Sequence, residues 1–486
     1  MNRELKIHPL DNVAVALTDM PGIPAGHKVA LCDIAAGENV VKYGYPIGHA
    51  LTAIPKGALV DHTNLATNLA GLLSYDDIRA EGTLSRESVG SLTQTFEGYR
   101  RADGRVGIRN EVWVIPTVGC VNGQCRQMVE RIRREFAEAS GIDAIHFFPH
   151  NYGCSQLSDD HENTRRILRD MVLHPNAGGV LIVGLGCENN QPHEFVKMLG
   201  DYDPQRIRLL VCQEVDGDEV EAGVGMLREI CRQVQTDRRE SVPLSALRVG
   251  LKCGGSDGFS GITANPLLGR FSDWLCMEQG GSAVLTEVPE MFGAERILMR
   301  RAVSDEVLHR TIRLINDFKQ YYLSHGEPVG ENPSPGNKAG GISTLEEKAL
   351  GCTQKAGTSP VCGVLDYGER LQFAGLHLLS APGNDLVAST ALAAAGCQLV
   401  LFTTGRGTPF STFVPTLKVS TQSDIARRKP QWIDFDAGPL LHGTSTDDLL
   451  QQFISFVINV ASGHCKTHAE EQGNAEFAIF KNGVTL

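Results

Sequence analysis

Cysteine stands beside glycine at the ends of several predicted strands. Cys120 ends the segment TVGC, Cys154 ends NYGC, Cys187 ends GLGC and Cys253 stands in KCGG. A single cysteine in such a place is as readily explained as a small apolar residue. Four in equivalent positions favour thiols that converge on one site.

Polar residues flank these cysteines, which is typical of a site rather than of core packing. They are His150, Asn151 and Gln156 around Cys154, Glu188, Asn189 and Asn190 after Cys187, and Ser256 and Asp257 after Cys253. Thiolates select soft or borderline metals and iron–sulfur clusters, whereas mixed histidine and carboxylate sets suit mononuclear Fe(II) or Mn(II). The residues by themselves leave both kinds of metal site open.

Two segments carry side chains suited to an anionic ligand. Arg109 and Asn110, in YRRADGRVGIRNE, can hold a carboxylate through parallel hydrogen bonds. The loop ENPSPGNKAGG supplies Asn337 and Lys338, and Lys355 follows it. Glycine lets such a loop approach a carboxylate or hydroxyl group closely. Because a run of charges is usually a solvated face, a structural role for the arginine segment also stays open.

Further candidates stand at the ends of short β runs near the N-terminus: His27, Lys42, His49 and His62. A lone histidine in such a place most often makes a structural hydrogen bond. Three of them in one small module keep a metal-binding or acid–base role open.

The elements that position these residues fall into successive regions. Residues 1–75 contain short apolar runs broken by glycine and proline, which predicts a small all-β domain. Residues 76–98 are polar and contain no β run, so we expect a linker. Residues 99–245 and 246–486 alternate apolar strands with amphipathic helices, which predicts a middle and a C-terminal α/β domain with Rossmann-like, doubly wound parallel sheets. Ligands of such sheets bind beyond the carboxyl ends of the strands.

Composition restricts the class of function. The chain has 486 residues, 42% of them hydrophobic, and a net charge of −12, which disfavours nucleic acid as a partner. No apolar run is long enough for a membrane helix and no signal peptide is apparent, so we expect a cytoplasmic protein. The thirteen cysteines include no CxxC pair, which is typical of reduced thiols. Neither a Walker A motif nor a GxGxxG fingerprint occurs, so no nucleotide cofactor is expected.

Long blocks of sequence resemble one enzyme family. GHKVALCDIAAGENVVKYGYPIGHA resembles the SAF (antifreeze-like, β-clip-like) module that begins members of the altronate/galactarate dehydratase family. The resemblance covers essentially the whole chain and is closer to the altronate branch. It rests on the blocks YRRADGRVGIRNEVWVIPTVGCVNG, HNYGCSQL, GGVLIVGLGCENN, CGGSDGFSGITANPLLGRFSD, VLTEVPEMFGAE, ENPSPGNKAGGISTLEEKALGCTQKAG, LLSAPGNDLVA, FTTGRGTP and AIFKNGVTL.

The resemblance implies a hydro-lyase that removes water from a sugar acid to give a 2-keto-3-deoxy acid. For the altronate branch the substrate is D-altronate and the product 2-keto-3-deoxy-D-gluconate, in hexuronate catabolism. The family is iron-dependent, so we expect Fe(II), with Mn(II) as a substitute and an iron–sulfur cluster left open. A homodimer is expected, with a small sugar acid as the ligand.

The resemblance and the residues together give a set of expected roles. The expected metal ligands are His27, His62, Cys154, Cys187 and Glu188. The expected substrate-binding residues are Arg109, Asn110, Asn337, Lys338 and Lys42. The expected acid–base residues are His150, Lys355 and His62.

One segment departs from the family pattern. Altronate dehydratases typically end the SAF module with His-x-His-Asn, whereas this chain has Asp61, His62, Thr63 and Asn64 there. Either His62 replaces the missing ligands or Asp61 supplies an oxygen. The departure keeps galactarate or another aldarate open as the substrate. A sulfolactate-type lyase and a carbohydrate-binding protein without catalysis also stay open.

Overall fold

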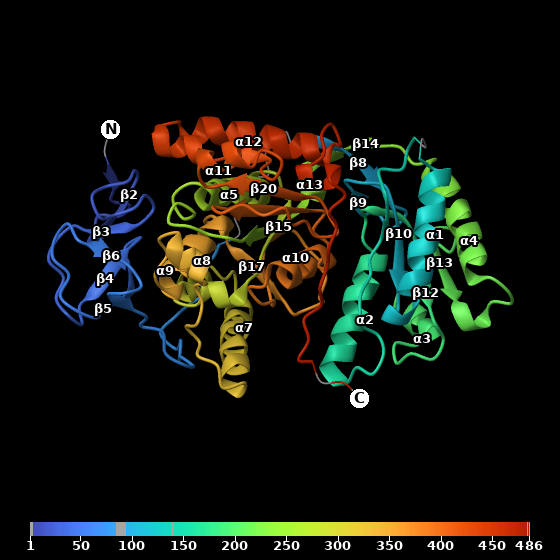
Figure 1. The fold of residues 1–486 in the computed structure, drawn as a ribbon, viewed down its shortest axis with the longest axis horizontal. Coiled ribbons are helices and arrows are strands. Elements are labelled where there is room, and N and C mark those ends of the chain that lie inside the picture. Colours follow the sequence, from blue (N-terminus) through green and yellow to red (C-terminus); the bar gives the residue numbers. More distant parts are fainter. Residues whose placement is uncertain (1–2, 84–93, 138–139, 484, 486) are drawn as a thin grey trace.

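The chain forms three parts arranged in a row (Figure 1). A β module lies at one end, a four-stranded parallel sheet with its helices lies at the other, and a larger α/β part lies between them. This computed structural model describes residues 3–83, 94–137, 140–483 and 485. Within those ranges, no helix has the length and apolar character needed to cross a membrane.

The N-terminal module consists of two small antiparallel sheets, in the orders β1-β2-β3-β6 and β4-β5-β7. The apolar runs expected to form strands do so. Tyr43 and Gly44 both have positive φ, so the β4–β5 hairpin closes through the two-residue turn whose twist suits paired strands. The strands are β1 Glu4–Leu5, β2 Val13–Ala16, β3 Lys28–Ala30, β4 Asn39–Lys42, β5 Tyr45–Ala50, β6 Leu59–Val60 and β7 Leu65–Ala66.

The second part has a parallel sheet in the order β11-β10-β12-β13. Alternate residues of β10 pack on opposite faces: Val112 and Val114 contact the core beneath α1 and α4, and Trp113 and Ile115 contact the core beneath α2. Helices therefore cover both faces. The elements are β10 Glu111–Pro116, α1 Asn122–Glu135, β11 Ile145–Phe147, α2 Ser158–Val172, β12 Ala177–Gly184, α3 Pro192–Lys197, β13 Ile207–Val211 and α4 Glu219–Val234.

The third part has a seven-stranded parallel sheet in the order β17-β18-β16-β15-β19-β20-β21. The chain moves from β15 to β16 on one side and later returns to β19 on the other, so the strand order reverses at β15. Such a reversal leaves a crevice at the carboxyl ends of the strands. The strands are β15 Arg248–Cys253, β16 Ser282–Leu285, β17 Val361–Leu365, β18 Gly375–Leu379, β19 Leu399–Thr404, β20 Thr416–Ser420 and β21 Phe435–Asp436.

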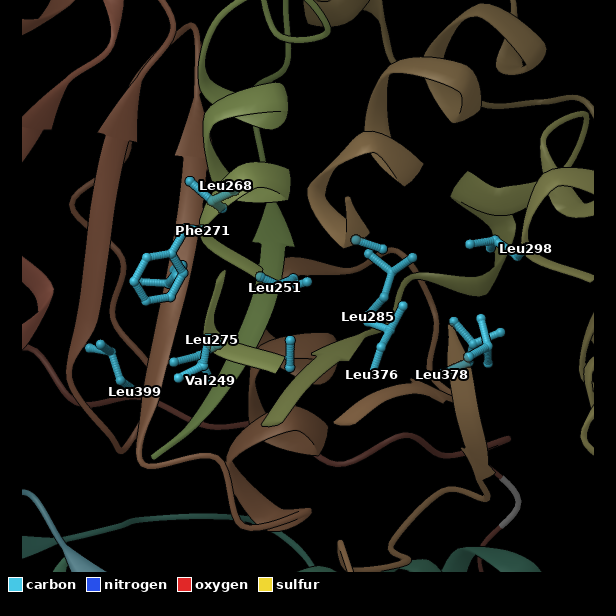
Figure 2. Packing of buried hydrophobic residues seen from close by; sticks show 14 of the residues in the cluster. Val249, Leu251, Leu268, Phe271, Leu275, Leu285, Leu298, Leu376, Leu378 and Leu399 are labelled. Atoms are coloured by element: carbon cyan, nitrogen blue, oxygen red, sulfur yellow. The ribbon is translucent and has the colours of Figure 1, made fainter. Parts of the chain in front are cut away.

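Helices surround this sheet and bury its apolar side chains. Figure 2 shows Leu251 and Val249 of β15 packed among leucines of the neighbouring strands, with Phe271 of α5 beside them. The helices are α5 Ala264–Asp273, α6 Glu295–Arg300, α7 Asp305–Ser324, α8 Pro335–Ala339, α9 Leu345–Cys352, α10 Asp385–Ala394, α11 Ser423–Arg428, α12 Thr446–Ala461 and α13 His468–Glu471.

The segment expected to be a linker is more ordered at its ends than its composition suggests. Tyr75 and Ile78 are buried in the core of the third part. Strand β8, Thr95–Arg100, pairs with β9, Val106–Gly107, and with β14, Glu240–Pro243. The expectation that residues 76–98 contain no strand was therefore wrong, because β8 begins at Thr95 and pairs with β14 far along the chain. Residues 84–93 of the expected linker lie outside the described residues.

A buried ion-pair network joins the N-terminal module to the third part. The carboxylate of Glu347 accepts from the ammonium groups of Lys28 and Lys42, each at 2.8 Å. All three side chains are almost fully buried. Backbone also approaches backbone closely, because a Cβ on Gly258 would lie 1.8 Å from the carbonyl oxygen of Gly26. Both observations indicate a tightly fitted, fixed contact.

We expect Glu347→Ala to destabilise the protein by about 3 to 5 kcal/mol, because it leaves two buried ammonium groups without a counter-charge. The free energy of unfolding would be measured by urea denaturation. Glu194→Ala is the control: the pair of Glu194 with Lys197 is largely exposed, so the change should be within about 0.5 kcal/mol. Equal effects of the two substitutions would contradict the assignment.

The same carboxylate should make stability depend on pH. Burial alone would raise the pKa of Glu347, but Lys28 and Lys42 outweigh burial and lower the pKa to about 2. A carboxyl group with a depressed pKa in the folded state stabilises fully above its unfolded pKa, near 4.5. That stabilisation should be lost as the pH falls from 4.5 towards 2. Urea denaturation of Glu347→Ala should show a weaker dependence over this range.

Candidate functional site

Three donor atoms from separate elements meet at the carboxyl edge of the seven-stranded sheet. Cys253 ends β15, Glu290 lies in the helical turn Val288–Met291 after β16, and Cys352 ends α9. The two Sγ atoms are 3.3 Å apart, and Glu290 Oε2 lies 3.3 Å from Cys253 Sγ and 3.1 Å from Cys352 Sγ. All three side chains are buried. We call this group the thiol–carboxylate cluster.

Three lysines surround the thiol–carboxylate cluster. Lys348 pairs with Glu290 at 2.7 Å. Lys355 pairs with Glu287 at 3.0 Å, and Lys252 binds both Glu287 and Asp385. Ammonium and carboxylate groups are therefore balanced in a region with little access to water.

The charges of this region are held firmly. Burial alone would raise the pKa of Glu290, but Lys348, Lys252 and Lys355 lower it to about 2. Burial alone would lower the pKa of Lys355, but Cys253 and Glu287 outweigh burial and raise it well above its usual value. The hydrogen bond with Cys253, together with burial, raises the pKa of Cys352 well above that of a free thiol. The region thus presents fixed ammonium groups beside a protonated thiol.

A small cavity adjoins the cluster where the N-terminal module contacts the third part. Its volume is about 10 Å³, and its lining includes Lys42, Tyr43, Ser256, Lys348 and Cys352. The Ser256 hydroxyl is buried and has no hydrogen-bond partner among the described residues. Lysines and an unpaired hydroxyl suit a ligand that carries both a carboxylate and hydroxyl groups. The hairpin tip of the N-terminal module covers this cavity.

Local geometry explains why these groups are held in place. Glu287, directly after β16, has φ of 66°, a conformation that is strained for a residue other than glycine. Its carboxylate is nevertheless fixed by Lys252 and Lys355 and by the backbone amide of Cys253. Strain that the surroundings maintain is typical of functional sites.

The proline- and glycine-rich loop, expected to be functional, lies against the cluster. Asn337 in α8 is buried, donates to the carbonyl oxygen of Ser256 at 2.9 Å and accepts from Lys348 at 3.2 Å. Ser334 caps the same short helix in a reciprocal capping box with Asn337. Asn337 and Lys355 therefore lie beside the cluster. Lys42 lines the adjoining cavity. Lys338, in contrast, is partly exposed on α8.

The arginine segment has a structural role, which corrects its assignment to substrate binding. Arg109 is buried and its guanidinium pairs with both carboxylate oxygens of Glu470, at 2.6 and 3.1 Å. It also donates to the carbonyl oxygens of Ile108 and Val460. The Asn110 amide is likewise used by backbone carbonyls and by Arg101. Neither side chain is left to bind a ligand.

His150 also has a structural role, which corrects its assignment to acid–base catalysis. Its Nε2 lies 2.7 Å from the carbonyl oxygen of Pro116, and its Nδ1 accepts from the amide of Tyr152 at 3.1 Å. Burial lowers the pKa of His150 to about 4. The ring is therefore neutral at physiological pH, with both nitrogens occupied.

The expected metal ligands are not brought together. His27 and His62 belong to the N-terminal module, whereas Cys154, Cys187 and Glu188 belong to the second part, at the opposite end of the molecule (Figure 1). The Glu188 carboxylate accepts from Thr117 and from backbone amides of its own loop. One ion cannot be bound by all five residues, because they lie in different parts of the molecule. The prediction failed because the sequence does not show which sheet each strand joins.

The segment that departs from the family pattern forms its own turn. The Asp61 carboxylate accepts from the amide of Thr63 at 2.8 Å and from its hydroxyl at 2.6 Å. Burial alone would raise the pKa of Asp61, but the hydrogen bonds from Thr63 lower it. His62 is exposed between them. Asp61 thus stabilises a turn between β6 and β7.

Glu287, Glu290 and Lys252 were not among the residues predicted from the sequence. The sequence did contain one signal. The apolar segment LRVGLKC contains a lysine and VLTEVPE contains two glutamates, although charged side chains are rarely found in buried strands. Such residues are almost never fully buried unless they are paired. The charged groups that pair with them lie 35 to 133 positions away in the chain, which no local pattern reveals.

Comparison with known proteins gives consistent matches along the chain. Profiles of one family match in succession: "Altronate/galactarate dehydratase SAF domain" at residues 2–68, "D-galactarate dehydratase/Altronate hydrolase, second domain" at 98–235, and "D-galactarate/Altronate dehydratase, C-terminal" at 244–485. The resemblance expected from the sequence blocks is confirmed.

Individual relatives match over nearly the full length. The altronate dehydratase of Bacillus subtilis (strain 168) is 55% identical and covers 100% of both chains, and that of Escherichia coli (strain K12) is 53% identical and covers 99% of both. The galactarate dehydratase (L-threo-forming) of Escherichia coli (strain K12) is 34% identical over 98% of this chain and 96% of its own. On this similarity, the chain belongs to the altronate/galactarate dehydratase family.

Proposed function

We propose that this enzyme is a hydro-lyase that converts D-altronate into 2-keto-3-deoxy-D-gluconate and water. The observation that carries the proposal is the 55% and 53% identity to two altronate dehydratases over nearly the whole chain. The galactarate dehydratase is more distant, at 34%, so altronate is preferred over galactarate. The buried charges around Glu287 and Glu290 favour an enzyme over a binding protein without catalysis.

The lysine-rich edge of the seven-stranded sheet supports a sugar acid as the substrate. Lys348 faces the cavity and is the ammonium group best placed for the substrate carboxylate. Removal of the proton at carbon 2 spreads negative charge onto that carboxylate, and Lys348 and Lys355 would stabilise the charge without reorganisation. The unpaired Ser256 hydroxyl would bind a hydroxyl group of the sugar chain, and Asn337 would hold Lys348 in position.

Glu290 is our candidate for the base at carbon 2. Its pKa of about 2 depends on Lys348, Lys252 and Lys355. A substrate carboxylate that pairs with Lys348 takes away part of this stabilisation, which raises the pKa of Glu290 towards that of an effective base. Glu290 then accepts the proton from carbon 2 and returns it to the hydroxide that leaves carbon 3. The enol product becomes the 2-keto acid, and Glu290 ends as a carboxylate.

Substrate entry requires movement of the hairpin tip at Tyr43. Ligand pockets usually have volumes of about 300 Å³ or more, whereas the cavity here has about 10 Å³. Tyr43 at the hairpin tip is packed so closely that a Cβ on Gly261 would lie 2.3 Å from its hydroxyl oxygen. Withdrawal of this tip would enlarge the cavity and expose Lys348.

The iron that the resemblance implies does not fit the thiol–carboxylate cluster. Cys253, Glu290 and Cys352 have donor atoms within 4.8 Å of one another. However, Lys348 already pairs with Glu290, and Lys355 and Lys252 add two further ammonium groups. A bound cation would have to displace the Lys348 ammonium group from Glu290 and the firmly held thiol proton of Cys352. No step of the reaction above passes through a metal at this cluster.

Several wider features belong to the same proposal. We propose that the second and third parts are Rossmann-like domains, with boundaries near residues 99–245 and 246–486, after an SAF domain over 1–75. All thirteen cysteines are free, which supports function in the reducing cytoplasm. A homodimer is proposed by analogy with the family alone.

Substrate profiling tests the proposed activity. The purified protein, supplied anaerobically with Fe(II), should form 2-keto-3-deoxy acid from D-altronate with a kcat/KM at least about 100-fold above that for galactarate. Preference for galactarate would transfer the assignment to the other branch of the family. Absence of turnover with every aldonate and aldarate tested would favour a binding protein.

Glu290→Gln should lower kcat by about 100-fold or more, because it removes the base but keeps the shape of the side chain. The KM for D-altronate should change little, and exchange of the carbon 2 proton with deuterated solvent should stop. Glu295→Gln is the control, since Glu295 is a buried carboxylate that binds Tyr75 and Lys319 outside the cluster. Normal kcat and exchange in Glu290→Gln would exclude Glu290 as the base.

A further inference from the structure

Three exposed thiols lie at one edge of the four-stranded sheet of the second part. Cys154 follows β11, Cys120 follows β10 and Cys187 follows β12, and these strands are neighbours in the sheet. All are parallel, so their carboxyl ends share one edge. Neighbouring strands are about 4.8 Å apart. The fold therefore places one thiol on each of three successive positions along this edge.

Hydrogen bonds fix the loops that carry these thiols relative to one another. The amide of Gly119 donates to the carbonyl oxygen of Tyr152 at 3.0 Å, which links the first loop to the second. The amide of Asn190 donates to Gly153 at 3.0 Å, which links the third to the second. Ser155, next to Cys154, has φ of 57°, an uncommon conformation for a residue other than glycine. Hydrogen bonds therefore hold the three loops in defined positions relative to one another.

A helix N-terminus and buried polar residues lie close in the chain to these thiols. Helix α1 begins at Asn122, two residues after Cys120, with no side-chain cap and no acidic residue in its first turn. Asn190 is 1% exposed and its side-chain oxygen has no partner among the described residues. The Glu188 carboxylate accepts from Thr117, and the Cys187 thiol accepts from the side-chain amide of Gln213 at 3.6 Å.

The spacing of the thiols excludes a single ion. A metal–sulfur bond is about 2.3 Å long, so one ion holds its sulfur ligands at most about 4.6 Å apart. Among the described residues, the only group whose donor atoms all lie within 4.8 Å is the thiol–carboxylate cluster. The sulfur atoms of Cys120, Cys154 and Cys187 are therefore too far apart for one ion, so a group that bound all three would have to be larger than one ion.

We propose that Cys120, Cys154 and Cys187 bind a [4Fe–4S] cluster, with one iron left for a ligand that is not cysteine. Thiolates select such clusters. Binding is a ligand exchange: three protein thiols lose their protons, three iron–sulfur bonds form to the protein, and three external ligands leave with those protons. No electron is transferred. The iron expected from the resemblance is thus placed in the second part, away from the lysines.

Anaerobic transfer from a synthetic [4Fe–4S] cluster with small thiolate ligands tests the site. The wild-type protein should retain about four iron and four sulfide per chain after desalting, with thiolate-to-iron charge-transfer absorption. Cys120→Ser, Cys154→Ser and Cys187→Ser should each lose most of this iron and sulfide. Cys32→Ser is the control, since Cys32 is an exposed cysteine of the N-terminal module, and it should retain both. Thermal unfolding of the variants before transfer checks that each is folded.

Three outcomes would overturn the proposal: no uptake by the wild type, full uptake by any of the three serine variants, or zinc bound at the same thiols in the purified protein. The result is separable from the proposed activity. Glu290→Gln should keep the cluster while it loses turnover of D-altronate. Loss of cluster uptake in Glu290→Gln would count against the separation of the two sites.

Discussion

The balance of buried charge around Glu287 and Glu290 is the constraint on which the rest of this structure depends. Lys252, Lys348 and Lys355 lie where water hardly reaches, and an unpaired ammonium group there would cost several kcal/mol. The sheet, the strained backbone at Glu287 and helix α9 bring the required carboxylates within reach. Packing and electrostatics therefore specify the same arrangement.

The same constraint connects stability to chemistry. Glu347 neutralises two lysines of the N-terminal module and lies one residue before Lys348, which faces the cavity. The ion pairs that attach the module thus continue directly into the proposed site. A substrate carboxylate can bind a lysine of this site only if a protein carboxylate, such as that of Glu290, gives up its ion pair with that lysine. Binding and a change in the basicity of Glu290 are consequently coupled in this account.

Much of the fold followed from local pattern. The N-terminal β runs and the alternation of strand and helix predicted the β module and the parallel sheets, because periodicity and glycine turns are local properties. Asn337 and Lys355 lie beside the buried charges, and their expected roles in substrate binding and acid–base catalysis stay predictions. Cys253 was expected at a strand end and is found there, whereas Cys120, Cys154 and Cys187 lie in the loops that follow their strands.

The errors arose where partners are distant in sequence. Arg109 resembled a carboxylate clamp because its partner Glu470 lies 361 positions away. The four cysteines resembled one site because the sequence does not reveal that β15 belongs to a different sheet from β10 and β12. Glu290 was not predicted, because its low pKa depends on three lysines that come together only in the folded chain.

The most direct test is a crystal structure of Glu290→Gln with D-altronate bound. The account predicts that the substrate carboxylate lies within hydrogen-bond distance of the Lys348 ammonium group, with the hairpin tip at Tyr43 displaced and Ser256 bound to a hydroxyl group. Substrate found elsewhere, with Lys348 still bonded to residue 290 and the cavity closed, would contradict it.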